Sequence, residues 1–362
     1  MKIVYLMHIE WNWIKQRPHF IAENLVSKYG KNNVVIVYPY RWNRKGLQKR
    51  SSEDLFLTKI FIIPIISKFT LGKRINEKFK QKQIRRIIKK QQPNLLYICG
   101  YEMGEYIPET YNGKILYDCM DDMIAFPAFR NIKTEILKRE KQLYDKSSIV
   151  LASSLSLKNK LTNRYGSKDI EIVRNGFKGE IISDDKRNNL RKTSNKFQLC
   201  YFGTIADWFD WDVIIKSLDD FSEIEYLLLG PIESGIVIPK HERIKYAGTI
   251  EHSQLYEVTK DSDCFIMPFK LNELILSVDP VKVYEYINFN RNILMIRYPE
   301  VERFDDFVSF YSSYEEYKNE LRKLLNNPSV KYNSENRINF LKENGWYSRT
   351  KQIIDIIEKE KE

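Results

Sequence analysis

A short stretch late in the chain combines residue types that suit a phosphate site. Asp279 is a good helix N-cap residue and Pro280 suits the first helical position, so we expect a helix to begin there, just after the apolar run 264–269. The free amide groups of a helix N-terminus attract anions. Lys282 and Glu285 share one helical face, where an ammonium group can contact phosphate oxygens and a carboxylate can accept hydrogen bonds from ribose hydroxyls. A nucleotide diphosphate fits this pattern, and a capped helix with a solvated Lys–Glu pair fits it equally well.

A cluster of carboxylates follows another apolar run, at 115–117. Asp118, Asp121 and Asp122 could hold a divalent cation or supply a general base that deprotonates an acceptor hydroxyl. Crowded carboxylates raise one another's pKa, which suits a base that works near neutral pH. The competing explanation is that Asp121 or Asp122 caps the following helix. We favour one capping and one catalytic carboxylate.

Turns at the ends of strand-like runs offer further contacts for a phosphate. Gly203, followed by Thr204, ends the run 199–202, and Gly230 ends the next run in the same way. A glycine there lets a ligand approach the backbone closely, although a tight turn alone explains it equally well. Arg174 precedes an Asn-Gly turn and could also reach a phosphate.

The segment after the first strand-like run argues against a dinucleotide-binding enzyme. Residues 8–13, which include Trp11, stand where a GxGxxG fingerprint would lie, and the sequence has no such glycine pattern there. Arg17 and His19 begin the first amphipathic helix, where they would face a ligand cleft. Helix capping explains both residues equally well.

Composition indicates a globular protein. The chain has 362 residues, 43% of them hydrophobic and 30% charged, which is ordinary composition and enough for two domains with substantial cores. It has no run of about 18 apolar residues and no cleavable leader, so we expect a cytoplasmic protein. Its four cysteines are scattered without a CxxC pair, which favours reduced core thiols over a metal or redox site.

Positive charge is concentrated in one region. Residues 41–92 hold 16 Lys+Arg against 3 Asp+Glu, which is more net positive charge than the +11 of the whole chain. Basic residues beside apolar ones suit an anionic bilayer, where each cation near the surface is worth about 1 kcal/mol. A solvated helix face explains the region equally well, and nucleic acid is disfavoured because no nucleic-acid module accompanies it. The candidate membrane contacts are Arg85, Arg86, Lys89 and Lys90.

Apolar, β-branched runs alternate with amphipathic stretches, which predicts an α/β fold with mostly parallel sheets. The predicted strands lie at 3–7, 34–38, 95–99, 115–119, 149–153 and 171–174, and, after a polar stretch, at 198–202, 225–229, 244–246, 264–267 and 293–296. Helical periods fill gaps between them, at 20–29, 79–90 and 133–146.

We therefore divide the chain into four parts, which are a first Rossmann-like domain at 1–180, a linker at 181–196, a second Rossmann-like domain at 197–340 and a C-terminal helix at 341–362. The last helix could cross back to the first domain. Two doubly wound domains that face each other bind ligands in the cleft between the carboxyl ends of their strands.

Five motifs follow one another along nearly the whole chain. They are Gln-Arg-Pro-His at 16–19, Tyr-Asp-Cys-Met-Asp-Asp at 117–122, Val-Arg-Asn-Gly at 173–176, Tyr-Phe-Gly-Thr-Ile at 201–205 and Asp-Pro-Val-Lys-Val-Tyr-Glu-Tyr at 279–286. In these motifs and their order the chain resembles bacterial GT-B glycosyltransferases. It is most similar to those of teichuronic-acid and capsular polysaccharide synthesis.

The resemblance implies that the second domain binds a nucleotide sugar, with uridine as the base, and that the first domain binds the acceptor. Lys282 would contact the diphosphate, Glu285 the ribose, and Gly203 would pass beneath the phosphates. The further residues assigned to the donor are Arg174, Thr204, Gly230 and Tyr284. The residues assigned to the acceptor side are Trp11, Arg17, His19 and Asp118.

The resemblance also implies a mechanism without a metal or another cofactor. Negative charge builds on the departing diphosphate, and Lys282, Arg174 and the helix N-terminus would stabilise it. Related retaining enzymes carry a Glu-x7-Glu pair, but here the earlier position is Ser277, so retention and inversion both stay open. If the product is inverted, Asp121 or Asp122 is the general base; if configuration is retained, these carboxylates bind acceptor hydroxyls.

The expected function is transfer of a sugar from a nucleotide-diphosphate sugar to a saccharide or polyprenyl-linked acceptor in bacterial surface polysaccharide synthesis. The basic region would then hold the enzyme peripherally at the inner face of the plasma membrane. A sugar-nucleotide epimerase of the same architecture is one alternative, since it also needs a diphosphate site and carboxylates. A non-catalytic scaffold of a polysaccharide-assembly complex is the other, and the absence of the earlier glutamate motivates it.

Overall fold

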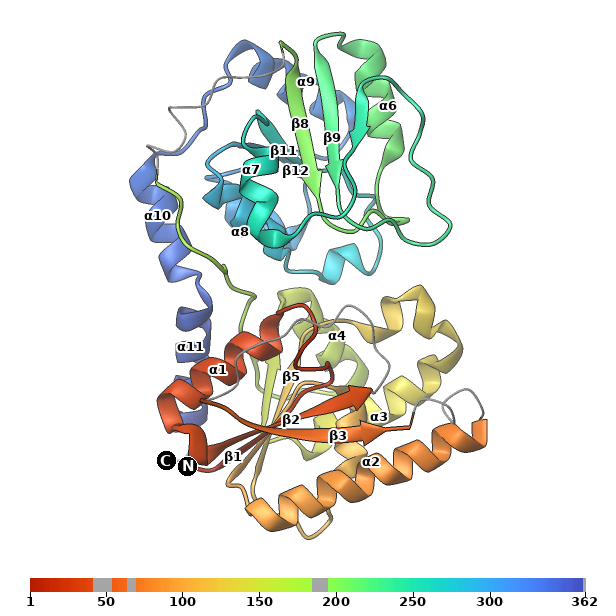
Figure 1. Ribbon diagram of the computed structural model, residues 1–362, viewed down its shortest axis with the longest axis vertical. Coiled ribbons are helices and arrows are strands. Elements are labelled where there is room, and N and C mark those ends of the chain that lie inside the picture. The colour runs from red at the N-terminus through yellow and green to blue at the C-terminus, as the bar shows by residue number, and fades with distance from the viewer. Residues whose placement is uncertain (42–53, 64–69, 184–194, 361–362) are drawn as a thin grey trace. The chain divides into compact units, whose positions relative to one another are not determined.

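A computed structural model describes residues 1–41, 54–63, 70–183 and 195–360 (Figure 1). The chain forms two compact units. Unit 1 consists of Met1–Asn175 and Trp346–Glu362, and unit 2 consists of Gly176–Gly345. Each unit contains one parallel sheet with helices packed on it.

The sheet of unit 1 has seven parallel strands in the order β3-β2-β1-β4-β5-β6-β7. Chain order reverses between β1 and β4, which makes this the switch point where doubly wound sheets bind ligands beyond their carboxyl ends. Side chains along β1 are fully buried because helices cover both faces of the sheet. The strands are β1 (Ile3–Leu6), β2 (Val34–Arg41), β3 (Phe56–Ile62), β4 (Leu95–Ile98), β5 (Lys114–Cys119), β6 (Ile149–Ala152) and β7 (Ile170–Ile172).

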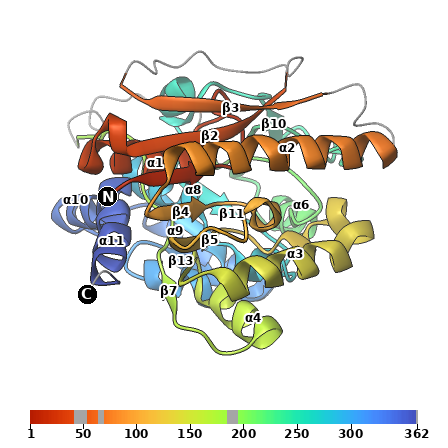
Figure 2. The ribbon, with the colours of Figure 1, turned by 90° about the horizontal axis from the view of Figure 1, so that it is seen from below.

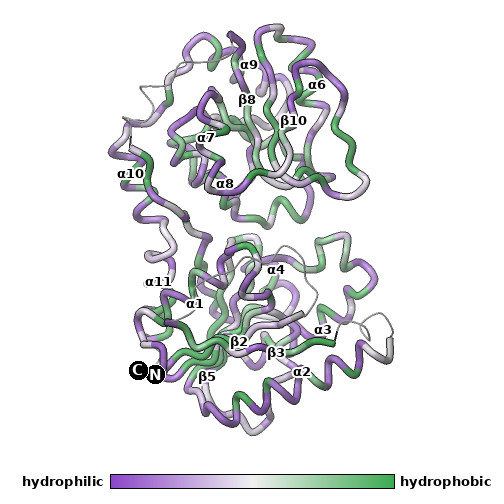
Figure 3. The backbone as a smooth tube through the Cα atoms, viewed as in Figure 1, coloured by the Kyte–Doolittle hydropathy of each residue, from purple (hydrophilic) through white to green (hydrophobic). Residues whose placement is uncertain are grey.

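The helices of unit 1 divide between the two faces of its sheet. Ile3 and Tyr5 pack in one apolar layer with α1 (Arg17–Tyr29) and α11 (Trp346–Lys359). Val4 and Leu6 pack in the other layer, with α2 (Thr70–Gln91), α3 (Lys133–Lys146) and α4 (Leu155–Tyr165). Hydrophobic residues concentrate along the central strands in Figure 3. Short 3-10 turns complete the unit: η1 (Lys31–Asn33), η3 (Tyr101–Tyr106), η4 (Met123–Ala125) and η5 (Pro127–Ile132).

The C-terminal helix α11 lies beside α1, as Figure 2 shows. The rings of Phe20 and Trp346 stack with their centroids 5.0 Å apart, and Asn24 Nδ2 donates a hydrogen bond to Thr350 Oγ1 at 3.1 Å. This helix was expected at 341–362. It begins at Trp346 and belongs to unit 1.

The sheet of unit 2 has six parallel strands in the order β10-β9-β8-β11-β12-β13, so its switch point lies between β8 and β11. The strands are β8 (Phe197–Phe202), β9 (Ile224–Leu229), β10 (Ile244–Tyr246), β11 (Cys264–Met267), β12 (Asn292–Ile296) and β13 (Ser309–Tyr311). The helices are α6 (Trp211–Asp220), α7 (Leu255–Thr259), α8 (Val281–Asn288), α9 (Tyr314–Asn326) and α10 (Ser334–Glu343), with the turns η6 (His252–Gln254), η7 (Ile275–Ser277) and η8 (Pro299–Phe304).

Helices cover both faces of this second sheet as well. Tyr226 of β9 hydrogen-bonds through its hydroxyl to Ser217 of α6 at 2.6 Å and to Tyr317 of α9 at 2.7 Å. On the opposite face, the ring of Phe202 packs edge-on against Tyr286 of α8, with centroids 4.9 Å apart. The prediction of two doubly wound, parallel α/β sheets is therefore confirmed.

The boundary between the units falls earlier than the expected linker. Asn288 of α8 accepts a hydrogen bond from the backbone N–H of Ile182 and donates one to the carbonyl of Glu180. The buried Arg337 of α10 donates to the carbonyl of Ile182 at 2.8 Å. These bonds attach the segment before residue 184 to unit 2. Most of the linker expected at 181–196 lies outside the described residues, which resume at 195.

None of the helices in the described ranges is long and apolar enough to cross a membrane. The longest, α2, carries many lysine and arginine residues along its length.

Candidate active site

Two glycine turns meet at the switch point of unit 2. Gly203 follows β8 with a φ of +140°, and Gly230 follows β9 with a φ of +123°, both in the region that favours glycine. A Cβ atom on Gly230 would lie 2.2 Å from the carbonyl oxygen of Gly203. A Cβ atom on Gly203 would lie 2.0 Å from Cε of Lys282. The turns therefore stack on each other, and the lysine side chain lies directly on the first.

Lys282 is a half-buried cation in the first turn of α8. Desolvation lowers the pKa of its amino group, and the nearby Glu285 carboxylate opposes that shift. Its Nζ lies 5.8 Å from the centre of the Tyr201 ring, and it has no hydrogen-bond or ion-pair partner among the described residues. A poorly solvated ammonium group beside glycine backbone gains most from an anion, so this cluster suits a phosphate.

The start of α8 differs from the prediction by one residue. Pro280 occupies the N-cap position, and no side chain within the described ranges caps the helix. The expectation that Asp279 caps it is wrong. The buried Asp279 carboxylate accepts a hydrogen bond from Arg303 of η8, which also donates from Nη1 to the Tyr284 hydroxyl at 2.8 Å. The aspartate therefore fixes the loop before α8.

Tyr284 is a correction to the donor-site assignment. Its side chain is fully buried, its ring packs edge-on against Phe304, and its hydroxyl is held by Arg303. Tyr284 follows Lys282 by two residues on the helix, so the two side chains point to different faces. The tyrosine belongs to the core of unit 2.

Glu285 lies one turn beyond Lys282 on the same face of α8. Its Oε1 hydrogen-bonds to Nε2 of His252 at 2.6 Å, and His252 is exposed at η6. Sequence pattern alone does not point to this histidine, because 33 residues separate it from Glu285. A ligand hydroxyl that reaches Glu285 would therefore also meet an imidazole.

The remaining donor-side predictions fall in two places. Thr204 is exposed next to Gly203, and its carbonyl accepts a hydrogen bond from the Tyr201 hydroxyl at 2.7 Å. Arg174 belongs to unit 1, and its carbonyl accepts a hydrogen bond from Arg17 at 3.1 Å. Within unit 2 the structure thus brings Gly203, Gly230 and Lys282 together, with Thr204 and Glu285 as sequence or helical neighbours.

The acceptor-side residues of unit 1 are buried. Arg17 forms a two-point ion pair with Asp118, at 3.0 Å from Nε and 2.8 Å from Nη2, and Tyr97 donates a further bond to Asp118 at 2.8 Å. Arg17 is 5% exposed and Asp118 is not exposed at all. This pair ties α1 to β5 and β4 inside the unit. The structure therefore corrects the assignment of both residues to acceptor contact.

His19 and Trp11 are corrected in the same way. His19 caps α1, because its Nδ1 accepts a hydrogen bond from the backbone N–H of Gln16 at 3.2 Å. Its Nε2 lies 3.0 Å from the carbonyl oxygen of Trp11. Both side chains are at most 1% exposed, within the layer between β1 and α1. The capping alternative accounts for His19.

Asp122 is also a structural residue. Its carboxylate is buried and accepts hydrogen bonds from both Nη atoms of Arg164 and from Nζ of Lys160, each at 2.8 Å. Burial opposes the charge, but the hydrogen bonds from Arg164 and Lys160 hold the pKa of Asp122 below its ordinary value. A carboxylate held by two cations is a poor base, so the structure corrects its catalytic assignment. It does not cap the following turn through its side chain either.

Asp121 differs from its neighbours because its side chain is exposed at the carboxyl edge of β5. The protein packed around it desolvates the carboxyl group and raises its pKa; the charges of His8 and Arg17 oppose this shift and that of Asp122 adds to it. Asp121 remains the candidate base. His8, directly after β1, is a neighbour that the sequence did not single out. Its position beyond the first parallel strand is the signal that would have found it.

The basic helix α2 has an exposed face. Arg85, Arg86, Lys89 and Lys90 are all exposed. The apolar residues between them are not available for contact, since Ile84 and Ile88 are buried against the sheet. Ile75 and Phe79, nearer the start of the same helix, are 48% and 39% exposed. Part of the basic region, at 42–53 and 64–69, lies outside the described residues.

No group of three or more His, Cys, Asp or Glu side chains in the described ranges is placed to hold a metal ion. The cysteines are buried and unpaired, as expected. Ser277 is buried and donates its hydroxyl hydrogen to the carbonyl of Glu273 at 2.7 Å.

No protein-family model matches the chain. Over 244 residues it is 26% identical to an uncharacterised glycosyltransferase of Methanocaldococcus jannaschii, and the alignment covers 60% of each chain. The chain thus spans less than two thirds of the length of this relative.

Solved structures resemble the whole chain in fold. Sucrose-phosphate synthase of Thermosynechococcus elongatus matches with a TM-score of 0.74 at 10% identity, over 99% of both chains. Anabaena HepE in complex with UDP-glucose matches with a TM-score of 0.72 at 12% identity, over 99% of this chain and 100% of that one. WaaG, a glycosyltransferase involved in lipopolysaccharide biosynthesis, matches with a TM-score of 0.65 at 12% identity, over 98% of this chain and 99% of that one. The architecture is GT-B, as the sequence predicted.

Proposed function

We propose that the protein is a glycosyltransferase that moves a sugar from a UDP-sugar to a saccharide or polyprenyl-linked saccharide in bacterial surface polysaccharide synthesis. The observation that carries the proposal is the half-buried Lys282, which lies on the stacked turns of Gly203 and Gly230 at the switch point of unit 2. The name of the archaeal relative and the UDP-glucose bound to HepE support it.

In the proposed reaction the bond between the anomeric carbon and the diphosphate oxygen breaks, and the diphosphate leaves with the bonding electrons. Lys282 and the first amide groups of α8 stabilise the negative charge that develops there, and Glu285 binds the ribose hydroxyls. The acceptor hydroxyl bonds to the anomeric carbon and gives up its proton. Asp121 takes that proton if the product is inverted; if configuration is retained, the departing diphosphate oxygen takes it and Asp121 binds an acceptor hydroxyl. Arg174 is proposed as a further phosphate contact, and no metal or other cofactor is invoked.

A binding panel tests the donor site. We expect UDP and UDP-glucose to raise the melting temperature of the protein, and ADP and GDP to do so less. Lys282→Ala removes a charge-assisted hydrogen bond worth about 1.5–3 kcal/mol, so its Kd for UDP should rise about 10- to 150-fold. Lys240→Ala, which removes an exposed lysine elsewhere in unit 2, is the matched control. A Kd for UDP that is unchanged in Lys282→Ala would reject the assignment of Lys282 to the diphosphate.

A product assay separates transfer from the two alternatives. The protein is incubated with UDP-glucose alone and the products are separated by chromatography. Slow release of UDP and free glucose supports a transferase, because water then replaces the acceptor. Appearance of an epimerised sugar nucleotide would support an epimerase, and UDP-glucose binding without turnover under any acceptor would support a scaffold.

We further propose that the enzyme acts in the cytoplasm, attached peripherally to the inner face of the plasma membrane. Support comes from α2, where the exposed cations Arg85, Arg86, Lys89 and Lys90 share one helix with the exposed Ile75 and Phe79. Cations attract the anionic surface, and apolar side chains add burial at the interface.

A further inference from the structure

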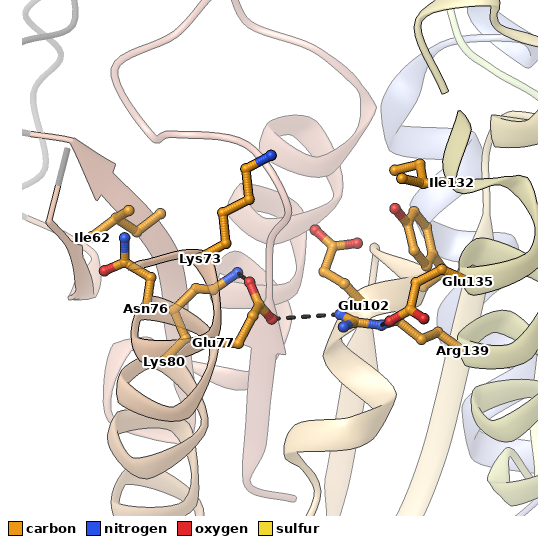
Figure 4. A pocket seen from close by; sticks show the side chains of 10 residues that line it. Ile62, Lys73, Asn76, Glu77, Lys80, Glu102, Ile132, Glu135 and Arg139 are labelled. Atoms are coloured by element: carbon orange, nitrogen blue, oxygen red, sulfur yellow. Dashed lines mark hydrogen bonds and ion pairs between the residues drawn. The ribbon is translucent and has the colours of Figure 1, made fainter. Parts of the chain in front are cut away.

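A cavity of about 390 Å³ opens in unit 1 between the first turns of α2, the turn η3 and the start of α3. Tyr101 and Glu102 reach it from the loop directly after β4, one of the two strands at the switch point of the sheet. Its size lies within the range of ligand sites in proteins. The residues that line it, shown in Figure 4, are Ile62, Lys73, Asn76, Glu77, Lys80, Tyr101, Glu102, Ile132, Glu135 and Arg139.

One wall of the cavity is held by a network of ion pairs. Glu77 of α2 pairs with Lys80 on the same helix and with Arg139 of α3 at 3.4 Å. Arg139 Nε also donates to Glu135 Oε1 at 2.6 Å. The dashed lines in Figure 4 follow this chain from α2 to α3. Because the network joins two helices, these side chains are fixed before a ligand arrives.

Three other polar groups in the lining are not engaged. The amino group of Lys73, the hydroxyl of Tyr101 and the carboxylate of Glu102 have no hydrogen-bond or ion-pair partner in the part of the chain that the structure describes. They offer a donor, a donor–acceptor and a two-oxygen acceptor. Ile62 and Ile132 add apolar surface beside them. A ligand that matches this lining has both hydroxyl groups and an apolar face.

The charges of the lining exclude a strongly ionic ligand. Lys73, Lys80 and Arg139 are balanced by Glu77, Glu102 and Glu135. A phosphate would meet carboxylates and a cation would meet ammonium groups, so neither gains a net electrostatic attraction. A neutral sugar carries adjacent hydroxyls that donate to a carboxylate, together with a C–H face that packs on an aromatic ring.

We propose that this cavity binds a neutral sugar residue of the acceptor saccharide. Glu102 accepts hydrogen bonds from sugar hydroxyls, Lys73 donates to one, and the ring of Tyr101 lies against the C–H face. The proposal rests on the proposed transferase function and adds to it a place and a chemical class for the acceptor.

The loop that carries Glu102 also lies beside His8, a neighbour of the candidate base. A Cβ atom on Gly100 would lie 2.7 Å from Cβ of His8 and 2.9 Å from Glu102 Oε2, so His8 and Glu102 flank the same glycine. His8 is also one of the charges that act on Asp121. Glu102 follows β4 and Asp121 follows β5, which is the neighbouring strand. A sugar residue bound at Glu102 would therefore lie beside the place where Asp121 meets the reacting hydroxyl.

Saturation-transfer NMR on the full chain tests the proposal with methyl glycosides of glucose, galactose, mannose and N-acetylglucosamine. We expect at least one glycoside to give a signal. Its Kd should rise at least fivefold in Glu102→Gln and in Tyr101→Ala, and stay within twofold in Glu109→Gln, an exposed glutamate of the following loop that does not line the cavity. Melting temperatures of the variants confirm folding, and Lys73→Ala serves as a second probe if Tyr101→Ala unfolds.

Three outcomes overturn the assignment: no glycoside gives a signal, the Kd of the glycoside stays within twofold of wild type in Glu102→Gln and Lys73→Ala, or inorganic phosphate displaces the glycoside. UDP binding, measured in the same samples, tests the proposed function separately. A glycoside signal that depends on Glu102 in a protein that binds no UDP would keep the sugar site and reject the transferase. UDP binding that depends on Lys282, without any glycoside signal, would keep the donor site of the proposed transferase and reject the sugar site.

Discussion

Replacing Gly203 by alanine should disturb the donor site in a way that the structure makes quantitative. The new Cβ would lie 2.0 Å from Cε of Lys282, whereas carbon atoms prefer about 3.5–4.0 Å. The lysine is the flexible partner, so its end must move by about 1.5–2 Å, which is too far to keep a hydrogen bond to the same phosphate oxygen. We expect the Kd for UDP to rise about 10- to 150-fold, as in Lys282→Ala.

The same substitution also strains the backbone, because Gly203 has a φ of +140°. An L-residue in such a conformation costs about 1–3 kcal/mol, which in a unit of this size lowers the melting temperature by roughly 2–12 °C. Gly235 provides the matched control. Its φ is +91° and open space surrounds it, so Gly235→Ala should cost similar stability and leave UDP binding within about twofold.

Isothermal titration with UDP on Gly203→Ala, Gly235→Ala, Lys282→Ala and the double variant Gly203→Ala/Lys282→Ala completes the experiment. If the alanine acts through the lysine, the double variant binds no more weakly than Lys282→Ala alone. Gly203→Ala binding UDP as tightly as Gly235→Ala would refute the reasoning, because the lysine would then tolerate the crowding or play no part in binding.

Other perturbations address unit 1. Asp122→Asn leaves Arg164 and Lys160 without their anion and should lower the free energy of unfolding, measured in urea, by about 2–3 kcal/mol. The loss should be smaller than for a fully buried ion pair because both cations are partly exposed. Because the pKa of Asp122 is lowered, wild type holds this stability above about pH 4 and loses it as pH falls further, whereas the variant should lack that dependence. If the product is inverted, Asp121→Asn should reduce kcat about 100-fold or more with unchanged UDP affinity, and a loss below tenfold would remove Asp121 as the base. Flotation with phosphatidylglycerol vesicles should be lost when four cations of α2 are changed to glutamate, since each is worth about 1 kcal/mol near the surface; unchanged flotation would reject membrane attachment. These cations are Arg85, Arg86, Lys89 and Lys90.

Most strands could be predicted because strands of a parallel sheet are buried on both faces and read as unbroken apolar runs. The strands β3 and β13 were not predicted. In β3, Phe56 and Phe61 are exposed at the edge of the sheet while Ile60 is buried, so its pattern lacks a continuous core signal. The strand β13 is only three residues long. For α3 the sequence pattern and the structure agree over 133–146.

The sequence allowed the residues of the candidate site to be named, but it did not show which of them are buried. The sequence pattern puts Gly203 and Lys282 after two strands, β8 and β11. These strands are neighbours in the sheet, so the two residues meet. It could not separate Asp118, Asp121 and Asp122, because their roles depend on partners far along the chain. Asp118 meets a cation 101 residues earlier, and Asp122 meets one 42 residues later. Only Asp121 is left at the surface, and no local pattern records that difference.

The interrupted course of the chain through unit 1 sets an order of events during synthesis. Trp346, Ile353, Ile354 and Ile357 of α11 complete the apolar layer on α1, yet all of unit 2 precedes them in the chain. During synthesis, α1 therefore emerges from the ribosome before the helix that covers it, and it stays uncovered until residues 176–345 and then α11 have emerged. Unit 2, by contrast, emerges as one continuous segment. The unit that is numbered second can close first, while the apolar side of α1 stays without its α11 cover.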